Sequence, residues 1–123
     1  MNENILKRLD DIVFHDVPVE KISFKTEHLS DFSIYFSLYD ESKKSFENWI
    51  IKFIDITELT SDKLIFNSES YLEIFSFDYK FDELFECKIH FLLGFGQPSF
   101  EIKLKCEKIE LNKLRPTMGM QHA

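Results

Sequence analysis

The stretch CKIHFLLGFGQPSFEIKLKCEKIEL, residues 87–111, contains two runs of alternating side chains joined by a turn rich in glycine and proline. In the second run, every second residue from Phe100 to Cys106 is apolar, and charged residues lie between them. In the first run, apolar residues recur from Cys87 to Leu93 with the same period. A period of two is typical of a strand with one buried face. These residues therefore predict a β-hairpin.

The register of this hairpin follows if Gly94 pairs with Ser99 around a four-residue loop. The expected cross-strand neighbours are Leu93 with Phe100, Phe91 with Ile102, Ile89 with Leu104, and Cys87 with Cys106. Two facing cysteines can form a redox disulfide, supply half of a metal site, or remain reduced thiols in an apolar core. We favour reduced thiols, because the neighbours on that face are apolar and offer no further ligand. His90 does not complete a metal clip with Cys87, since strand residues three apart point to opposite faces.

The apolar residues of the chain are weighted toward strand formers. There are 14 Phe among the 123 residues, whereas alanine occurs only at Ala123 and glycine at three positions. Aromatic and β-branched residues favour strands, and alanine is the best helix former. The composition therefore favours a β-rich fold. The scarcity of glycine argues against a small, tightly coiled barrel, which needs glycine at its corners.

The charge of the chain bears on its partners. A formal net charge of -7 argues against nucleic acid as a partner, because phosphate contacts need clustered Lys and Arg. The first residues, MNENILKRLDDIV, lack the apolar core of a secretory signal, and no window approaches the ~18 consecutive apolar residues of a membrane helix. Two cysteines without a signal peptide favour a reducing compartment. We therefore expect a cytoplasmic protein without a membrane or nucleic-acid partner.

The remaining chain predicts one helix and several further strands. An amphipathic helix is expected over residues 2–13, with an apolar stripe that includes Leu9 and Val13. Further strands are expected over residues 20–28, 32–39, 64–66 and 71–81, the first two as a hairpin. Residues 46–57 fit either a helical stripe or a central strand, and their β-branched residues favour the strand. The apolar phase slips by one after Cys106, which predicts a β-bulge or a bend near Glu107 and Lys108.

These elements predict a single mainly β (α+β) domain over residues 1–113, followed by a mobile C-terminal tail over residues 114–123. The expected architecture is an antiparallel sheet or sandwich of six to seven strands, with the N-terminal helix packed on it.

Two groups of residues are candidate partner-binding sites. Ser33, Tyr35, Ser37 and Tyr39 share one face of the strand over 32–39, and half-polar aromatic faces of this kind are enriched at protein interfaces. The alternative is that this face packs beneath the helix or a second sheet. Four carboxylates also lie within nine residues, at Asp78, Asp82, Glu83 and Glu86. They form either a solvated turn or a surface that attracts a basic partner protein.

No catalytic constellation is recognisable. His15 and Asp16 are the one adjacent pair that suggests acid–base chemistry, but a general base also needs an orienting group and a substrate pocket. We interpret the pair as a structural junction whose side chains bond the backbone where the helix passes to the strand. The sequence contains no glycine-rich phosphate loop and no HExxH or GxSxG motif. We therefore expect no catalytic residue, no metal and no cofactor.

Four features together resemble a family of small bacterial domains of unassigned function, similar to the immunity proteins that neutralise polymorphic toxins. They are the opening helix, the Phe14-His15-Asp16 junction before a strand, the run Trp49-x-Ile51-x-Phe53-x-x-Ile56, and the closing strand from Phe100 to Ile109. The resemblance implies a small β-rich domain that acts by binding a protein, such as a toxin. The alternatives are a binding module for an apolar small ligand held between the sheet and the helix, and, third, an enzyme of unknown class.

Overall fold

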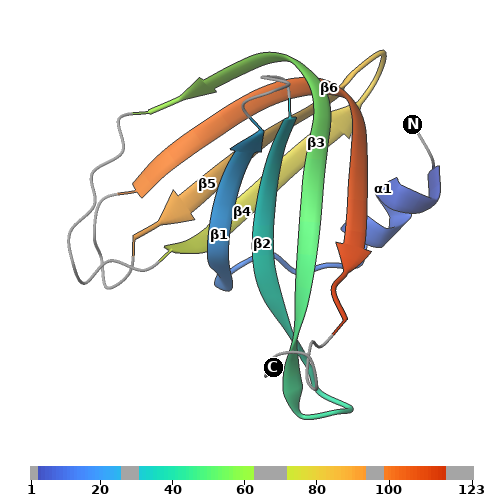
Figure 1. Ribbon diagram of the computed structural model, residues 1–123, viewed down its shortest axis with the longest axis vertical. Helices are drawn as coiled ribbons and strands as arrows, with labels where there is room; N and C mark the ends of the chain where they lie inside the picture. Colours follow the sequence, from blue (N-terminus) through green and yellow to red (C-terminus); the bar gives the residue numbers. More distant parts are fainter. Residues whose placement is uncertain (1–2, 26–30, 63–71, 94–98, 116–123) are drawn as a thin grey trace.

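The computed structural model describes residues 3–25, 31–62, 72–93 and 99–115, and shows one short helix and six antiparallel strands that close into a barrel (Figure 1). The elements are α1 (Glu3–Asp10), β1 (Val17–Lys25), β2 (Asp31–Asp40), β3 (Ser45–Ser61), β4 (Leu72–Phe81), β5 (Phe85–Leu92) and β6 (Ser99–Lys113). The predictions of a mainly β fold, of antiparallel pairing and of a single N-terminal helix are confirmed for these residues.

The strands follow the order β1-β2-β3-β6-β5-β4, and β4 pairs with β1 to close the ring. Two three-stranded meanders, β1–β3 and β4–β6, are thus joined along two seams, β3 with β6 and β1 with β4. The prediction of an antiparallel sheet or sandwich is wrong about the architecture, because the single sheet closes into a barrel. Closure lets every strand bury one face against the same interior.

None of the described strands contains a glycine although the barrel closes, so the argument from glycine scarcity is wrong. Pairing registers shift between Val19 and Lys21 in β1, and between Ile74 and Ser76 in β4, as in β-bulges. Such irregularities bend a strand and increase its twist. In addition, Asp16 and Asp55 adopt left-handed backbone angles, with φ of 64° and 58°. Aspartate tolerates this region better than most residues. Asp16 lies in the turn before β1, whereas Asp55 lies within β3, so bulges and Asp55 supply the curvature that glycine often supplies.

The β5–β6 hairpin has the predicted strands but a different register. Cys87 lies opposite Leu104, and Cys106 lies opposite Phe85, so the two cysteines are not direct neighbours as predicted. The pairing is shifted by two residues, which leaves each side chain on its predicted face. Phe91 and Ile102 accordingly lie in the interior as expected.

The ambiguous segment over residues 46–57 is part of β3, which confirms the predicted strand. The phase slip in β6 is also confirmed, because Cys106 and Ile109 are both fully buried although they lie three positions apart. The shift of pairing register lies on β3, between Ile56 and Glu58. At this place the Cys106 Sγ donates to the Lys108 carbonyl oxygen over 3.4 Å. Asp55, with its left-handed backbone, lies on β3 between the residues that pair with Lys108 and Cys106. Strands β3 and β6 therefore bend at the same place, Asp55 on β3 and residues 106–108 on β6.

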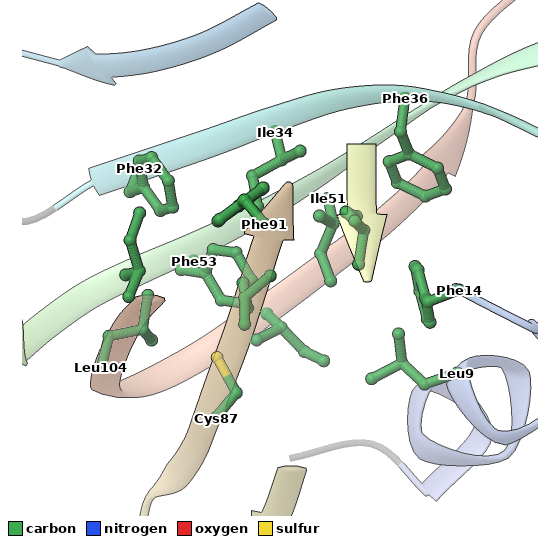
Figure 2. Packing of buried hydrophobic residues seen from close by; sticks show 14 of the residues in the cluster. Leu9, Phe14, Phe32, Ile34, Phe36, Ile51, Phe53, Cys87, Phe91 and Leu104 are labelled. Carbon is green, nitrogen blue, oxygen red and sulfur yellow. The ribbon is translucent and has the colours of Figure 1, made fainter. Parts of the chain in front are cut away.

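The interior of the barrel is filled by side chains, most of them aromatic or branched (Figure 2). Phe53 lies at its centre and contacts the rings of Phe32, Phe77 and Phe85, with centroids 5.8, 6.3 and 6.2 Å away. Figure 2 shows Leu9 and Phe14 at one end of this core and Leu104 at the other.

Helix α1 packs against an end of the core and not flat on a sheet face. It is shorter than predicted, and its Leu9 is buried in the core cluster. The guanidinium carbon of Arg8 lies 5.9 Å from the centroid of the Trp49 ring, and the Tyr79 hydroxyl donates to the Asp10 carboxylate. Val13, which was expected in the buried stripe, is 78% exposed because the chain has left the helix before this residue.

Some predictions lie outside the described residues: the strand over 64–66, the turn over 94–98 and most of the tail. Of that tail, Leu114 continues the pairing of β6, since its N–H donates to the Asn48 carbonyl oxygen over 2.7 Å.

Candidate functional site

The predicted aromatic face of β2, here called the Tyr face and made of Ser33, Tyr35, Ser37 and Tyr39, lies on the outside of the barrel. The intervening residues, such as Ile34 and Phe36, are fully buried in the core. Figure 1 shows β2 between β1 and β3, with α1 beyond β6. The helix therefore does not cover the Tyr face, although packing beneath the helix was one of the two alternatives.

The Tyr face continues onto β3 through cross-strand pairs. Tyr35 lies opposite Ile50, which is only 4% exposed although it is not part of the interior cluster. Ser37 lies opposite Asn48, and its hydroxyl donates to the Asn48 side-chain oxygen over 3.0 Å. Packed and hydrogen-bonded outer residues of this kind hold their side chains in fixed positions.

An exposed apolar group lies at the free end of the β2–β3 hairpin, which projects beyond the other strands in Figure 1. Tyr39 and Phe46 face each other there, with ring centroids 5.3 Å apart in an edge-to-face arrangement. They are 52% and 61% exposed. Leu114, the residue that follows β6, is exposed as well. We call Tyr39, Phe46 and Leu114 the hairpin tip.

Charged groups fix the turn beside the hairpin tip. The Asp40 carboxylate accepts hydrogen bonds from the Ser42 hydroxyl and the Ser42 backbone N–H, over 2.6 and 2.9 Å. The Ser42 hydroxyl bond is the main reason that the pKa of Asp40 lies below its usual value. Glu47 lies 2.7 Å from the Lys113 ammonium and 2.9 Å from that of Lys43, and hydrogen bonds from Lys113 and then Lys43 lower the pKa of Glu47. The tip is thus tied to β6 as well as to its own turn.

A cavity of about 350 Å³ opens on the same outer surface. Its lining consists of Ser23, Asp31, Ser33, Tyr35, Lys52, Ile54 and Glu110. Lys21 lies over the Tyr35 ring, with its ammonium 4.5 Å from the centroid. Asp31 also accepts a hydrogen bond from the Asp55 N–H over 3.3 Å. The cavity therefore combines an aromatic wall with two carboxylates and one ammonium group.

The structure places the four predicted carboxylates on the β4–β5 hairpin, away from the Tyr face. Asp78 lies opposite Lys88, and Glu86 lies opposite Lys80 with 4.0 Å between their charged atoms. Asp82 and Glu83 are exposed in the turn between the strands. Asp78 and Glu86, the two carboxylates on strands, therefore each lie opposite a lysine. Asp82 and Glu83 lie in the turn, outside the paired residues of β4 and β5.

His15 and Asp16 lie at the junction of the helical segment with β1, beside β4. The His15 Nδ1 is 3.2 Å from the Phe75 carbonyl oxygen, and its Nε2 is 3.3 Å from the Asp16 carboxylate. The Phe75 ring lies between the rings of His15 and His90, with centroids 5.1 and 5.6 Å away. Both nitrogens of His15 thus face groups of the protein itself.

The two cysteines are free and buried. Burial raises the pKa of the Cys106 thiol to about 11, and burial also raises the pKa of Cys87. A thiol is a nucleophile or a metal ligand only as the thiolate, so these groups are held in their unreactive form. Among the described residues, no three metal-ligating side chains come together.

Sequence patterns did not identify the hairpin tip or the contact between Asp10 and Tyr79. Phe46 was assigned to the apolar pattern of residues 46–57, although it follows a polar turn and is the natural partner of Tyr39 in a hairpin. The position of Phe46 directly after the polar turn is the sequence feature that could have predicted its contact with Tyr39. Asp10 and Tyr79 are 69 residues apart, and nothing local in the sequence links them.

Comparison of the chain with protein-family models, with curated proteins and with solved structures gave no match. Within the described part of the chain, no helix has the length and apolar character needed to cross a membrane.

Proposed function

We propose that this chain is a non-catalytic protein-binding domain, of the kind that neutralises a bacterial toxin by binding to it. The observation that carries the proposal is the exposed aromatic pair Tyr39 and Phe46 beside the Tyr face. Tyrosine and phenylalanine are enriched at the centres of protein interfaces, where their rings fill pockets of the partner and lose little conformational entropy. The surrounding ion pairs hold the hairpin in place before a partner arrives.

The charge of the domain supports a basic partner. The net charge is -7, and Asp31 and Glu110 line the cavity on the same surface as the Tyr face. Complementary charge raises association rates and selects against acidic partners more than it adds affinity. A basic protein that carries an apolar pocket for the hairpin tip would fit both features.

The alternative of an apolar ligand held between the sheet and the helix has less support. Phe32, Phe53 and Phe91 are completely buried and fill the interior (Figure 2). A ligand of useful size would have to displace several of these rings, and close-packed cores resist such changes.

The proposal is tested by measuring binding to the product of the adjacent gene, the natural candidate for a toxin. We expect calorimetry to show tight binding by the wild-type protein and at least 100-fold weaker binding by the double variant Tyr39→Ala/Phe46→Ala. A matched control is Phe81→Ala, which removes a partly exposed aromatic ring on β4, a strand that pairs with neither β2 nor β3. Equal affinity of the double variant and the control would contradict the proposal. Circular dichroism verifies that both variants are folded.

A further inference from the structure

Within the described residues, strand β4 has no strand neighbour along half of one edge. On the side away from β5, the described residues of β1 pair with β4 only at Leu72, Glu73 and Ile74. From Ser76 to Phe81, β4 remains paired with β5. The described chain places no strand against the opposite edge of this half. An unpaired edge presents a row of backbone N–H and C=O groups that can bind another extended chain.

A cleft of about 360 Å³ runs beside this edge. One wall is the chain from Leu9 to His15, and the other is β4 from Phe75 to Tyr79. The first wall comprises the end of α1 and the connection to β1 (Figure 1). The cleft is thus bordered by the same backbone groups that have no strand partner.

The walls of the cleft are apolar, and its charged side chains are acidic. Val13 and Phe75, which are 78% and 42% exposed, both contribute to the lining. The lining contains the carboxylates of Asp10 and Asp78 but no Lys or Arg side chain. Burial and then the hydrogen bond to Asp10 raise the pKa of Tyr79, and the charges of Asp10 and Asp11 act in the same direction. The charged side chains that line the cleft are therefore carboxylates, and Lys88 lies opposite Asp78 on β5.

This edge carries Lys80, and the chain from Leu9 to His15 lies beside it, but the cleft separates that chain from β4. Protected edges often carry Lys or Pro, or are covered by a helix or loop. The bulge at Phe75 does interrupt the strand, but it precedes the open half, which pairs regularly with β5 from Ser76 onward. Exposed apolar side chains next to an unpaired edge are instead typical of sites to which a peptide adds as a strand.

We propose that the open edge of β4, from Ser76 to Phe81, and the cleft beside it bind an extended peptide segment of another protein. The segment alternates basic and apolar residues and adds to the barrel as a further strand. Backbone hydrogen bonds to β4 provide affinity, apolar side chains contact Val13 and Phe75, and basic side chains lie near Asp10 and Asp78. The site is separate from the Tyr face, and the proposal does not depend on the function proposed for that face.

The test uses a fluorescently labelled peptide of alternating lysine and valine, with binding followed by anisotropy. Two further peptides are methylated on alternate backbone nitrogens, one in each phase. In a strand, alternate N–H groups point to opposite sides. We expect one phase to abolish binding and the other to preserve it, and we expect bound peptide to slow amide exchange within residues 76–81. Equal binding of both methylated peptides, or protection elsewhere in the chain, would overturn the proposal.

Charge variants provide the second part of the test. Asp78→Lys should weaken binding at least tenfold, whereas Glu107→Lys, the same charge change on an exposed residue of β6, should leave it unchanged. A peptide of alternating glutamate and valine should bind at least tenfold more weakly than the lysine peptide. If the glutamate peptide binds equally well, the cleft selects only for apolar groups and the proposal is wrong. The Tyr39→Ala/Phe46→Ala variant should bind the lysine peptide normally, which separates this site from the Tyr face.

Discussion

The two seams that close the barrel differ in length. Along the β3–β6 seam, residue pairs run from Trp49 with Lys113 to Ser61 with Ile102, through the bend at Asp55. Along the β1–β4 seam, the described residues form three pairs, at Leu72, Glu73 and Ile74. The long seam joins the two meanders along most of their length, whereas the described part of the short seam pairs only the first residues of β4. We therefore assign stability mainly to the β3–β6 seam and the proposed peptide binding to the edge of β4 beyond the β1–β4 seam.

The largest effect expected from this difference concerns two matched core substitutions. Ile109 lies on the long seam and Ile74 on the short one, and both are essentially fully buried. Removing such a side chain costs about 2–5 kcal/mol, and less where the site can relax. We expect Ile109→Ala to lower the free energy of unfolding by about 3–5 kcal/mol. The loss caused by Ile74→Ala should be smaller than this by at least about 1 kcal/mol.

Urea denaturation of the two variants and the wild-type protein measures this difference. The control is Phe46→Ala on β3, because Phe46 is 61% exposed and its loss should change the stability by at most about 0.5 kcal/mol. Equal losses for Ile109→Ala and Ile74→Ala would mean that the two seams contribute alike, and the comparison between them would fail.

Native-state hydrogen exchange should show the same contrast without any substitution. Amides that bridge β3 and β6 should exchange only on global unfolding, whereas those that bridge β1 and β4 should exchange through local opening. We expect rates at least about 100-fold faster for the short seam, which corresponds to about 2.7 kcal/mol. Residue-resolved exchange by NMR provides the measurement. Equal rates along the two seams would show that the barrel opens only as a whole.

The distribution of side chains between interior and surface was predictable because alternation in a strand reports burial directly. Ile89, Phe91, Ile102 and Leu104 are buried together, as their period indicated. The register was not predictable, since a shift of two residues keeps every side chain on its face and leaves the hydrophobic pattern unchanged.

Closure of the barrel was not predictable for a different reason. The strands bend at bulges and at Asp55, whose backbone is left-handed, and an aspartate within an alternating run does not by itself predict a bend. The Tyr face was predictable from its alternation on one strand. The partners that complete the outer surface, Phe46 and Leu114, come from other strands, so only the sheet order brings them together. The same holds for the cleft beside β4.

The smallest expected effect concerns the ion pairs at the end of the long seam, where Glu47 of β3 binds Lys113 of β6 and Lys43. Hydrogen bonds from Lys113 and then Lys43 lower the pKa of Glu47 from its ordinary value of 4.5. A carboxyl group whose pKa is lower in the folded state stabilises the fold fully above its unfolded pKa, and this contribution is lost as the pH falls through the folded pKa. The stabilisation by Glu47 should therefore decline as the pH falls below about 4.5.

In Glu47→Gln this contribution is absent at every pH, so the stability of the variant should depend less on pH in the acidic range. Urea midpoints measured from about pH 6 to about pH 3 should show the wild-type advantage shrinking as Glu47 becomes protonated. The pKa of Asp40 is also lowered, but Asp40 is present in both proteins and its effect cancels in the difference. Curves that stay parallel across this range would show that the ion pairs do not strengthen the end of the long seam. The two seams would then differ only in the number of paired strand residues.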